Sequence, residues 1–173
     1  MNVLSKFKPI KTFVFDVDGV LTDGSLLILN DGQMARRMNI KDGYALQLAV
    51  KKGYRVLVIS GGTSEAVVAR LNKLGVTDVF LQIADKKEKL LGYMEIQGLT
   101  PAEILFMGDD IPDHSVMQEV GLPCCPADSV PEIIAISQYI SPFPGGHGCV
   151  RDVIEKVLKL NGHWDLDTHL TAK

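Results

Sequence analysis

The chain has 173 residues, of which 46% are apolar and 23% are charged, and its formal net charge is −3 at pH 7. This length and composition suit a single domain, residues 1–173, with a sizeable core, and they exclude an intrinsically disordered chain. The nearly balanced charge gives no electrostatic basis for nucleic acid as a partner.

Short apolar runs alternate with stretches of helical spacing along the chain. In chain order, strands are expected at 12–15, 55–59, 79–81, 104–107, 123–125 and 139–140. The helices expected among them are 44–52, 64–74, 86–97, 113–120, 130–137 and 149–160. Continuously apolar strands that alternate with helices predict an α/β fold, with a Rossmann-like parallel sheet and helices on both faces.

Residues 25–39 interrupt this alternation, because two strand-like runs, 25–29 and 33–39, flank an Asp-Gly pair at 31–32. Such a pair predicts a β-hairpin inserted after the first strand. A lone hairpin is marginally stable, and the first arm is apolar on both faces. We therefore expect contact with another subunit, with packing on the chain's own core as the alternative. Residues 164–173 are expected to form a loosely held tail.

The cysteines and the N-terminal sequence bear on the cellular location. Cys124, Cys125 and Cys149 lack the spacing of a metal site or of a disulfide framework, and we expect reduced thiols. The first ten residues lack the apolar run of a signal peptide. No stretch reaches the ~20 apolar residues that a membrane span requires. The sequence thus predicts a soluble, cytoplasmic protein without membrane contact.

Three of the expected strands end in polar turns that contain glycine, after residues 15, 59 and 107. Parallel sheets bind ligands at the carboxyl ends of their strands, so one shared site is expected there. At the first turn, the adjacent charges of Asp16 and Asp18 require a compensating cation or proton. Gly19 lets the backbone approach a ligand closely. Ordinary turn formation is the competing interpretation of this motif.

A second acidic cluster, Asp109, Asp110 and Asp113, follows the expected strand at 104–107. Its alternative role is a helix N-terminus, with Asp110 or Asp113 as the N-cap. Converging carboxylates need a metal, and Asp16 and Asp109 would supply the hard oxygen ligands that Mg²⁺ prefers. The sequence therefore favours a magnesium site over a purely structural cluster.

Two further segments suggest anion binding. Ser60 and Gly61 offer a hydroxyl and a flexible amide at the entrance to a helix, where anions bind. Lys86 starts an expected helix, and its position alone does not distinguish it from a surface lysine. Clustered carboxylates, Mg²⁺ and an anion-binding corner together indicate phosphoryl chemistry. A metal-bound carboxylate can be its nucleophile.

The order and spacing of these residues resemble the haloacid dehalogenase-like superfamily of phosphatases, over about residues 11–160. Its four motifs match Asp-x-Asp-Gly at 16–19, the hydroxyl of Ser60, Lys86, and Gly-Asp-Asp-x-x-Asp at 108–113. The first and last motifs are specific in combination, and the serine and lysine gain meaning from their places between them. The second aspartate of the first motif implies phosphate ester hydrolysis rather than dehalogenation.

This resemblance implies a role for each matched residue. Asp16 would be the nucleophile that forms an aspartyl-phosphate, and Asp18 the general acid and base. Ser60 and Lys86 would hold the phosphoryl oxygens, with Lys86 also steadying Asp16. The groups implied for Mg²⁺ are the side chains of Asp16 and Asp109, the backbone carbonyl of Asp18 and, around the metal's waters, Asp110 and Asp113.

The gaps between the motifs hold only the hairpin, single helices and short strands, so no cap domain fits. The chain resembles the cap-less branch that includes 3-deoxy-D-manno-octulosonate 8-phosphate (KDO-8-phosphate) phosphatase and its nonulosonate 9-phosphate relatives. Segments 16–24, 41–44 and 145–151 add to the agreement. In that branch the hairpins form tetramers and a neighbouring subunit closes the active site, which implies a homotetramer here.

KDO-8-phosphate phosphatases usually carry an arginine where this chain has Gly62. That arginine is expected to help hold the sugar carboxylate, and Arg70, Lys41 or His147 could replace its charge. A solvated loop is the competing interpretation of His147. The residues expected around the phosphate or the substrate are Gly19, Thr22, Gly61, Lys41, Arg70 and His147. The leading substrate is KDO-8-phosphate, of lipopolysaccharide synthesis, and a sialic acid or KDN 9-phosphate is the alternative.

A non-catalytic protein on the same fold is the alternative of a different class. Such a protein would be expected to lose the nucleophile, the acid/base or a metal ligand. This chain retains all of them, at Asp16, Asp18, Ser60, Lys86 and Asp109. The sequence therefore predicts an active, magnesium-dependent phosphatase.

Overall fold

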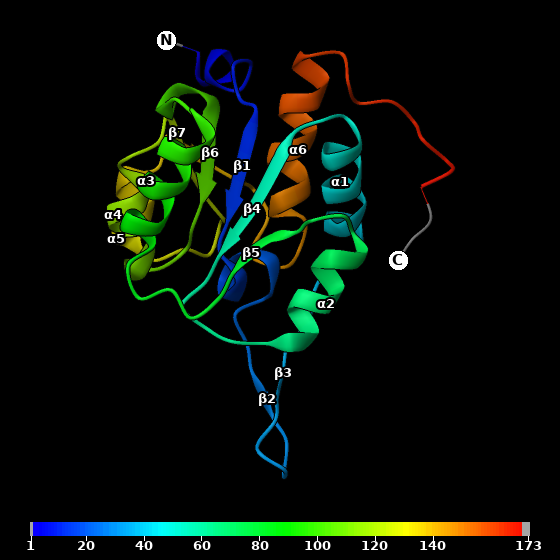
Figure 1. Ribbon diagram of the computed structural model, residues 1–173, viewed down its shortest axis with the longest axis vertical. Helices are drawn as coiled ribbons and strands as arrows, with labels where there is room; N and C mark the ends of the chain where they lie inside the picture. The colour runs from blue at the N-terminus through cyan, green and yellow to red at the C-terminus, as the bar shows by residue number, and fades with distance from the viewer. Residues whose placement is uncertain (1, 171–173) are drawn as a thin grey trace.

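The computed structural model describes residues 2–170 and contains a six-stranded sheet between two layers of helices (Figure 1). The strands are β1 (Thr12–Phe15), β4 (Arg55–Ile59), β5 (Asp78–Phe80), β6 (Ile104–Met107), β7 (Leu122–Cys125) and β8 (Tyr139–Ile140). They are all parallel and lie in the order β5-β4-β1-β6-β7-β8. The prediction of a Rossmann-like parallel sheet is confirmed.

The helices divide between the two faces of the sheet, with α1, α2 and α6 on one face and α3, α4 and α5 on the other (Figure 1). Their bounds are α1 (Ile40–Lys51), α2 (Glu65–Lys73), α3 (Lys86–Gln97), α4 (His114–Met117), α5 (Pro131–Ile136) and α6 (Cys149–Leu160). Four shorter turns are η1 (Val3–Lys6), η2 (Val17–Leu21), η3 (Pro101–Glu103) and η4 (Ile111–Asp113). Within residues 2–170, no helix has the length and hydropathy needed to cross a membrane.

Alternate side chains of each strand enter different halves of the core. In β1, Phe13 and Phe15 pack on the side of α1 and α6, and Val14 packs on the side of α3 and α4. All three side chains are fully buried. Burial of such a side chain stabilises the fold by roughly 1.5–3 kcal/mol. A strand with helices on both faces therefore needs an unbroken apolar sequence.

The strand order creates a switch point at the centre of the sheet. From β1 the chain continues outward through β4 and β5, and then crosses to β6, β7 and β8 on the other side. Sheets of this order bind ligands beyond the carboxyl ends of the central strands, where the order reverses. Phe15 at the end of β1 pairs with Met107 at the end of β6. The polar turns after these two strands therefore lie side by side.

The predicted hairpin is present, with strands β2 (Leu27–Ile28) and β3 (Met34–Ala35) that are shorter than the predicted arms. The turn closes by a hydrogen bond from Leu29 N to Gln33 O, 2.8 Å long. Figure 1 shows the hairpin projecting from the carboxyl edge of the sheet, away from the layered core. From β1 to α2 the described chain contains η2, the hairpin, α1 and β4, which leaves no cap domain there.

Local hydrogen bonds set the helix boundaries. α1 begins at Ile40, earlier than the predicted start at 44, because the side chain of Asn39 accepts a hydrogen bond from Lys41 N at 2.8 Å. The predicted helix at 113–120 is shorter in the structure, where η4 precedes it and α4 ends at Met117. The last strand and the last helix in chain order, β8 and α6, have their predicted bounds.

The C-terminal segment differs from the loosely held tail that the sequence predicts. The ring of Trp164 meets that of Tyr44 edge to face, with centroids 6.2 Å apart, and the Arg151 guanidinium lies 5.2 Å from the centroid of Trp164. Asp167 pairs with Lys51 of α1. These aromatic and charged contacts fasten the segment to α1 and α6. Residues 171–173 of the predicted tail lie outside the described residues.

Candidate active site

The polar turns after three strands meet in one cleft at the carboxyl edge of the sheet. The strand ends are level, because Phe15 of β1 pairs with Val58 of β4 on one side and with Met107 of β6 on the other. The cleft has a volume of about 710 Å³. The predicted site residues that line it are Asp16, Asp18, Ser60, Gly61, Lys86, Asp109, Asp110 and Asp113.

The turn after β1 is the distorted helical turn η2, in which Asp18 and Gly19 depart from helical angles. Thr22 organises this turn, since its hydroxyl oxygen accepts hydrogen bonds from the backbone N–H groups of Gly19 and Gly24, both at 3.3 Å. Thr22 is fully buried, and it is not part of the cleft wall. Within this chain, Thr22 therefore shapes the loop instead of making the predicted contact with phosphate.

Two glycines make room for the acidic side chains. Gly19 has a φ of 87°, and a Cβ atom at this position would lie 2.0 Å from Oδ2 of Asp109. A Cβ atom at Gly108 would lie 2.5 Å from Cβ of Asp113. A side chain at either position would displace a carboxylate. Gly19 therefore allows a close approach, but of the protein's own Asp109 rather than directly of a ligand.

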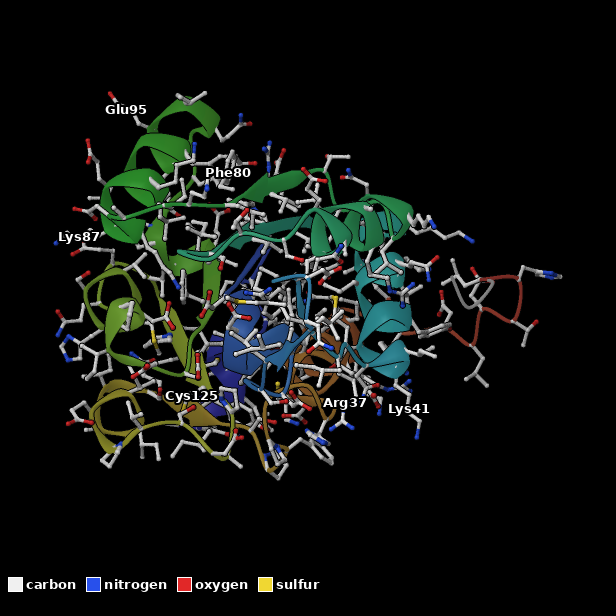
Figure 2. All side chains as sticks on the ribbon, turned by 90° about the horizontal axis from the view of Figure 1, so that it is seen from below. Arg37, Lys41, Phe80, Lys87, Glu95 and Cys125 are labelled. Atoms are coloured by element: carbon white, nitrogen blue, oxygen red, sulfur yellow. The ribbon has the colours of Figure 1, made fainter. Side chains whose placement is uncertain are left out.

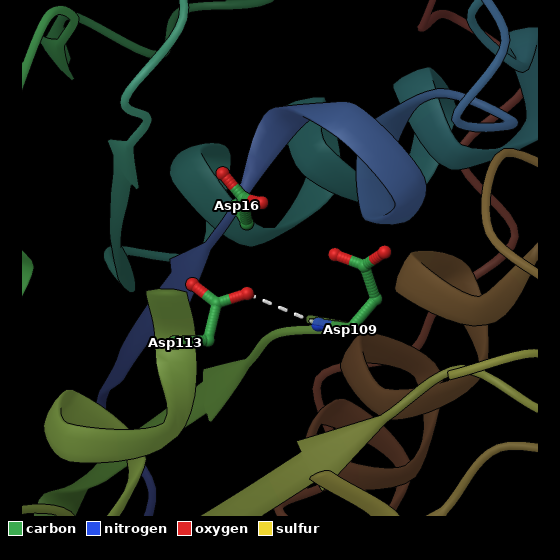
Figure 3. A group of neighbouring side chains, drawn as sticks. All are labelled: Asp16, Asp109 and Asp113. Atoms are coloured by element: carbon green, nitrogen blue, oxygen red, sulfur yellow. Dashed lines mark hydrogen bonds between the residues drawn. The ribbon is translucent and has the colours of Figure 1, made fainter. Parts of the chain in front are cut away.

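One carboxylate oxygen from each of Asp16, Asp109 and Asp113 lies within 4.8 Å of the others, and together these residues form the acidic cluster (Figure 3). Asp113 has partners for both oxygens: Oδ1 accepts from Nζ of Lys86 at 2.7 Å, and Oδ2 from the backbone N–H of Asp109 at 3.1 Å. Among the described residues, the buried Oδ1 of Asp109 has no hydrogen-bond partner. Asp113 therefore supports the cluster, and Asp109 keeps an oxygen available for a ligand.

Lys86 is the buried counter-ion of the acidic cluster. It is the first residue of α3, which Asp85 caps by accepting a hydrogen bond from Glu88 N at 2.9 Å. Its Nζ lies 2.9 Å from Oδ1 of Asp16 and 2.7 Å from Oδ1 of Asp113. The Lys86 side chain is only 5% exposed. The capped start of α3 thus delivers a cation that the sequence pattern alone did not distinguish.

Burial and mutual repulsion shift the acidic groups away from their usual pKa. Burial raises the pKa of Asp16 to about 6, with Asp113 adding to the rise and Lys86 opposing it. Burial raises the pKa of Asp109 to about 8, and the charges of Asp16 and Asp113 add to this rise. Burial acts to lower the pKa of Lys86, but the carboxylates of Asp113 and Asp16 outweigh it and raise the value.

This donor set fits a hard divalent cation. The acidic cluster gathers carboxylate oxygens, the ligands that Mg²⁺ prefers, and one of them is the unpartnered Oδ1 of Asp109. The raised pKa values of Asp16 and Asp109 show that their charges are poorly compensated by Lys86 alone. A cation bound beside them would supply the missing compensation. Asp110, which is exposed, accepts a hydrogen bond from Ile111 N and caps η4 at the rim.

The turn after β4 presents a hydroxyl and backbone amides to the cleft. Oγ of the buried Ser60 accepts a hydrogen bond from the backbone N–H of Gly62 at 3.1 Å. The Ser60 backbone is fixed by hydrogen bonds with Phe80 and Ile83, 2.9 and 3.0 Å long. Because Oγ accepts in its bond with Gly62, the Ser60 hydroxyl can donate to an anion in the cleft. Gly61 lines the cleft beside it.

Two residues near the cleft escaped the sequence predictions. Arg36 follows β3 and forms an ion pair with Asp18, 2.6 Å from Nε to Oδ1. Gln82 lines the cleft with a φ of 57°, the one positive φ of a non-glycine residue in residues 2–170. Backbone strain of this kind is held in place by surrounding structure and is frequent at functional sites. The only feature of the sequence that could have pointed to Arg36 is that it is a basic residue on the predicted hairpin. No feature of the sequence pointed to Gln82.

Three residues predicted near the substrate lie elsewhere. Lys41 and His147 line a second cleft of about 640 Å³, beside α6, and Figure 2 shows Lys41 at the outer side of the molecule. A Cβ atom at Gly43 of α1 would lie 2.7 Å from a guanidinium nitrogen of Arg70. Because these residues border other surfaces, the structure gives no support to their contact with a substrate in the same chain's cleft.

The late glycine-rich segment supports the turn after β1. A Cβ atom at Gly145 would lie 1.9 Å from the carbonyl oxygen of Gly19. The backbone N–H of Gly146 donates to the carbonyl oxygen of Val20 at 2.9 Å. The segment 145–151 therefore serves the site by packing its backbone against the loop that carries Asp16 and Asp18.

No protein-family model matches the chain. A search of curated proteins found similarity to the 3-deoxy-D-manno-octulosonate 8-phosphate phosphatase KdsC of Escherichia coli K12. The two sequences are 32% identical over 164 residues, which cover 95% of this chain and 87% of the relative.

Solved structures are similar over the same extent. The 3-deoxy-D-manno-octulosonate 8-phosphate phosphatase of Moraxella catarrhalis, in complex with a magnesium ion, a phosphate ion and KDO, has a TM-score of 0.88 and 32% identity, with 91% of each chain covered. The corresponding phosphatase of Yersinia pestis has a TM-score of 0.90 and 28% identity, with 93% of this chain and 87% of the other covered.

Proposed function

The chain belongs to the KDO-8-phosphate phosphatase family of the haloacid dehalogenase-like superfamily, and we propose that it hydrolyses KDO-8-phosphate to KDO and inorganic phosphate. It is a phosphatase, and Mg²⁺ is its cofactor. The observation that carries the proposal is the acidic cluster with its buried Lys86, beside the hydroxyl of Ser60, in one cleft of a chain with these relatives.

In the proposed reaction, Asp16 is the nucleophile. One of its carboxylate oxygens forms a bond to phosphorus, and the bond from phosphorus to the sugar oxygen breaks. Asp18, which lines the same cleft, gives its proton to the departing sugar oxygen. Asp18 then takes a proton from a water molecule, whose oxygen attacks phosphorus and releases Asp16. The two steps together return Asp16 to a free carboxylate and Asp18 to its protonated form.

The remaining polar groups hold the phosphoryl group and the metal. Ser60 and Lys86 would bind phosphoryl oxygens, and Lys86 holds Asp16 in place through its 2.9 Å contact. The side chains of Asp16 and Asp109 and the backbone carbonyl of Asp18 would hold Mg²⁺, with Asp110 and Asp113 around its waters. When bound, Mg²⁺ would offset negative charge on the phosphoryl group.

The alternative substrate is a nonulosonate 9-phosphate of the sialic acid or KDN type. Gly62 favours this alternative, because an arginine is expected at this position to hold the carboxylate of KDO. Both substrates carry a phosphate on a primary alcohol at the end of a sugar acid, so the catalytic residues would act on them alike. They differ in the length of chain between the phosphate and the carboxylate.

The deciding experiment measures phosphate release from KDO-8-phosphate and from a nonulosonate 9-phosphate, each with Mg²⁺ and with a chelator. We expect magnesium-dependent release with a clear preference, in kcat/KM, for KDO-8-phosphate. A preference for the nine-carbon substrate would make the alternative correct. Absence of magnesium-dependent release from both would remove the proposed function and leave the fold unaffected.

We also propose a homotetramer assembled through the hairpins. The support is a set of exposed apolar side chains on and beside the hairpin, at Leu26, Leu27, Ile28, Leu29, Met34 and Ile40. Ile28 is 70% exposed, and several exposed apolar side chains in one short segment are typical of protein interfaces. A neighbouring subunit on this surface would cover the cleft, which has no cap domain of its own.

A cytoplasmic location is part of the same proposal. The three cysteines, Cys124, Cys125 and Cys149, are all buried and free of disulfides. Reduced, buried thiols are usual in the reducing environment of the cytoplasm. There the product KDO would enter lipopolysaccharide synthesis.

A further inference from the structure

Arg36, at the end of the hairpin, forms an ion pair with Asp18 in the turn after β1. Its Nε lies 2.6 Å from Oδ1 of Asp18, and its Nη2 donates to Oδ2 at 3.3 Å. The Arg36 side chain is 8% exposed, whereas that of its neighbour Arg37 is 77% exposed and pairs with Asp23. A partly buried ion pair in which the guanidinium donates to both oxygens fixes the orientation of the carboxylate.

Residue 62, a glycine, lies beside the ion pair of Asp18 and Arg36. Gly62 is not among the glycines with positive φ, so its φ does not by itself require glycine. A Cβ atom there would lie 3.0 Å from Oδ2 of Asp18 and 3.5 Å from Nη2 of Arg36. At the adjacent Gly61, the nearest atom to a Cβ would be Ile83 O, at an ordinary 3.7 Å. Crowding against the Asp18 carboxylate, rather than a left-handed φ, therefore disfavours a side chain at position 62.

From these contacts we infer that Arg36 is the positioning residue for Asp18, and that Gly62 leaves room for the Asp18 carboxylate in the orientation that Arg36 holds. The inference rests on the proposed function, in which Asp18 transfers the proton. The guanidinium binds both carboxylate oxygens from the side of the hairpin, while the Asp18 side chain stays 39% exposed toward the cleft. Arg36 thereby limits the rotation of Asp18 without closing its access to a substrate.

This arrangement links the hairpin to the chemistry of the cleft. The strands β2 and β3 have two residues each, and a hairpin of this size is marginally stable alone. Arg36 follows β3 directly, and its Nη1 donates to Met34 O at 3.4 Å. Any contact that orders the hairpin therefore also orders the residue that holds Asp18.

The first test compares leaving groups in the Arg36→Met variant, with Arg37→Met as the matched control. A sugar alkoxide is a strong base and needs a proton from Asp18 to leave, whereas p-nitrophenolate is a weak base and leaves without one. We expect kcat/KM of Arg36→Met to fall at least about tenfold for KDO-8-phosphate and less than about threefold for p-nitrophenyl phosphate. Arg36→Lys should recover part of the loss, and Arg37→Met should match the parent. Equal losses on both substrates, or none on either, would overturn the inference.

The second test needs no activity and so separates the inference from the proposed function. We expect Gly62→Ala to lower the Tm of the parent by about 2 °C or more, and to lower that of Arg36→Met by much less, because the guanidinium no longer blocks Asp18 from moving aside. Gly61→Ala, as the control, should not lower Tm. If Gly62→Ala has the same effect in both backgrounds, the two positions are independent and the inference fails. A parent that does not hydrolyse KDO-8-phosphate would contradict the proposed function alone.

Discussion

Lys86 and Asp16 form a buried ion pair across two elements, with 2.9 Å between Nζ and Oδ1 and side chains only 5% and 10% exposed. Lys86 also holds Asp113, so one cation serves two carboxylates. The pair joins the start of α3 to the end of β1, and it fixes the proposed nucleophile before any substrate is present.

Replacement of Lys86 by methionine should therefore abolish most of the activity. The variant keeps the length of the side chain but loses the charge that holds Asp16 and that, in the proposed reaction, offsets the charge of the phosphoryl oxygens. We expect kcat to fall about a hundredfold or more. Without Lys86 the buried carboxylates lack a partner, and we expect a loss of roughly 3 kcal/mol of unfolding free energy at neutral pH.

Steady-state kinetics and urea unfolding of the same preparation measure both effects. Lys87→Met is the control, because Lys87 lies on the surface, 43% exposed, and pairs with Glu119. The control should retain the parent's kcat and stability. A Lys86→Met protein that turned over as fast as the parent would show that the ion pair has no part in the reaction.

Asp16→Asn should remove turnover while leaving the cleft nearly the same shape. The amide has no anionic oxygen to form a bond to phosphorus, so phosphate release should fall to the rate of a blank. Mass spectrometry after a rapid acid quench should detect one phosphoryl group on the parent and none on the variant. Asp31→Asn, in the turn of the hairpin, is the control. Turnover by Asp16→Asn at the parent's rate would exclude the aspartyl-phosphate.

The sequence located residues whose role depends on their local position. Asp16, Ser60 and Asp109 each follow a buried apolar strand, and parallel strands of this order must end at one edge. That reasoning predicted both the fold and the cleft. Lys86 needed the family resemblance, because the pattern around it is that of an ordinary helix start.

Other roles depend on tertiary contacts that no local pattern contains. Arg36 and Arg37 are adjacent in an arm with no repeating pattern, yet one is buried against Asp18 and the other is exposed. Trp164 lies in a polar segment of the sequence. Its contact with Tyr44 depends on the tertiary structure, in which α1 and α6 are adjacent. The fold was therefore more predictable than the partners of individual long side chains.

The metal-free protein should lose stability as the pH rises from about 5 to about 8. In the folded state, burial raises the pKa of Asp16 to about 6 and that of Asp109 to about 8, from the model-peptide value of 3.8. Raised values mean that the folded protein binds these protons more tightly than the unfolded chain does. Their stabilising contribution is thus complete below the unfolded pKa and is lost as the pH rises through the folded values.

Thermal unfolding in a chelator at about pH 5 and pH 8 measures this dependence. We expect a lower Tm at about pH 8, and we expect saturating Mg²⁺ to raise Tm more at pH 8 than at pH 5, because the metal binds ionised carboxylates. Without metal, the fall in Tm from pH 5 to pH 8 should be smaller for Asp109→Asn than for the parent. If the metal-free parent were more stable at pH 8 than at pH 5, the described electrostatics of the acidic cluster would be incorrect.

Gln82→Gly should stabilise the protein and weaken its binding of substrate. Glycine adopts a φ of 57° without the strain that glutamine bears, a difference of about 1 kcal/mol in unfolding free energy. Because Gln82 lines the cleft with Ser60 and Lys86, loss of its side chain should raise KM several-fold with little change in kcat. Gln82→Ala separates the two effects, since it removes the amide and keeps the strain. An unchanged KM in both variants would leave the strained residue without a role in binding.

A charge on the hairpin should divide the proposed tetramer. Ile28 is 70% exposed in the single chain, and burial of an introduced lysine in an apolar interface would require its desolvation without a partner. We expect Ile28→Lys to reduce the mass measured by light scattering from that of a tetramer to that of a dimer or monomer. Ile96→Lys is the matched control, because Ile96 is 81% exposed on α3 and should leave the mass unchanged. Since Arg36 ties the hairpin to Asp18, Ile28→Lys should also lower kcat/KM for KDO-8-phosphate. A tetramer that survives Ile28→Lys would place the interface elsewhere.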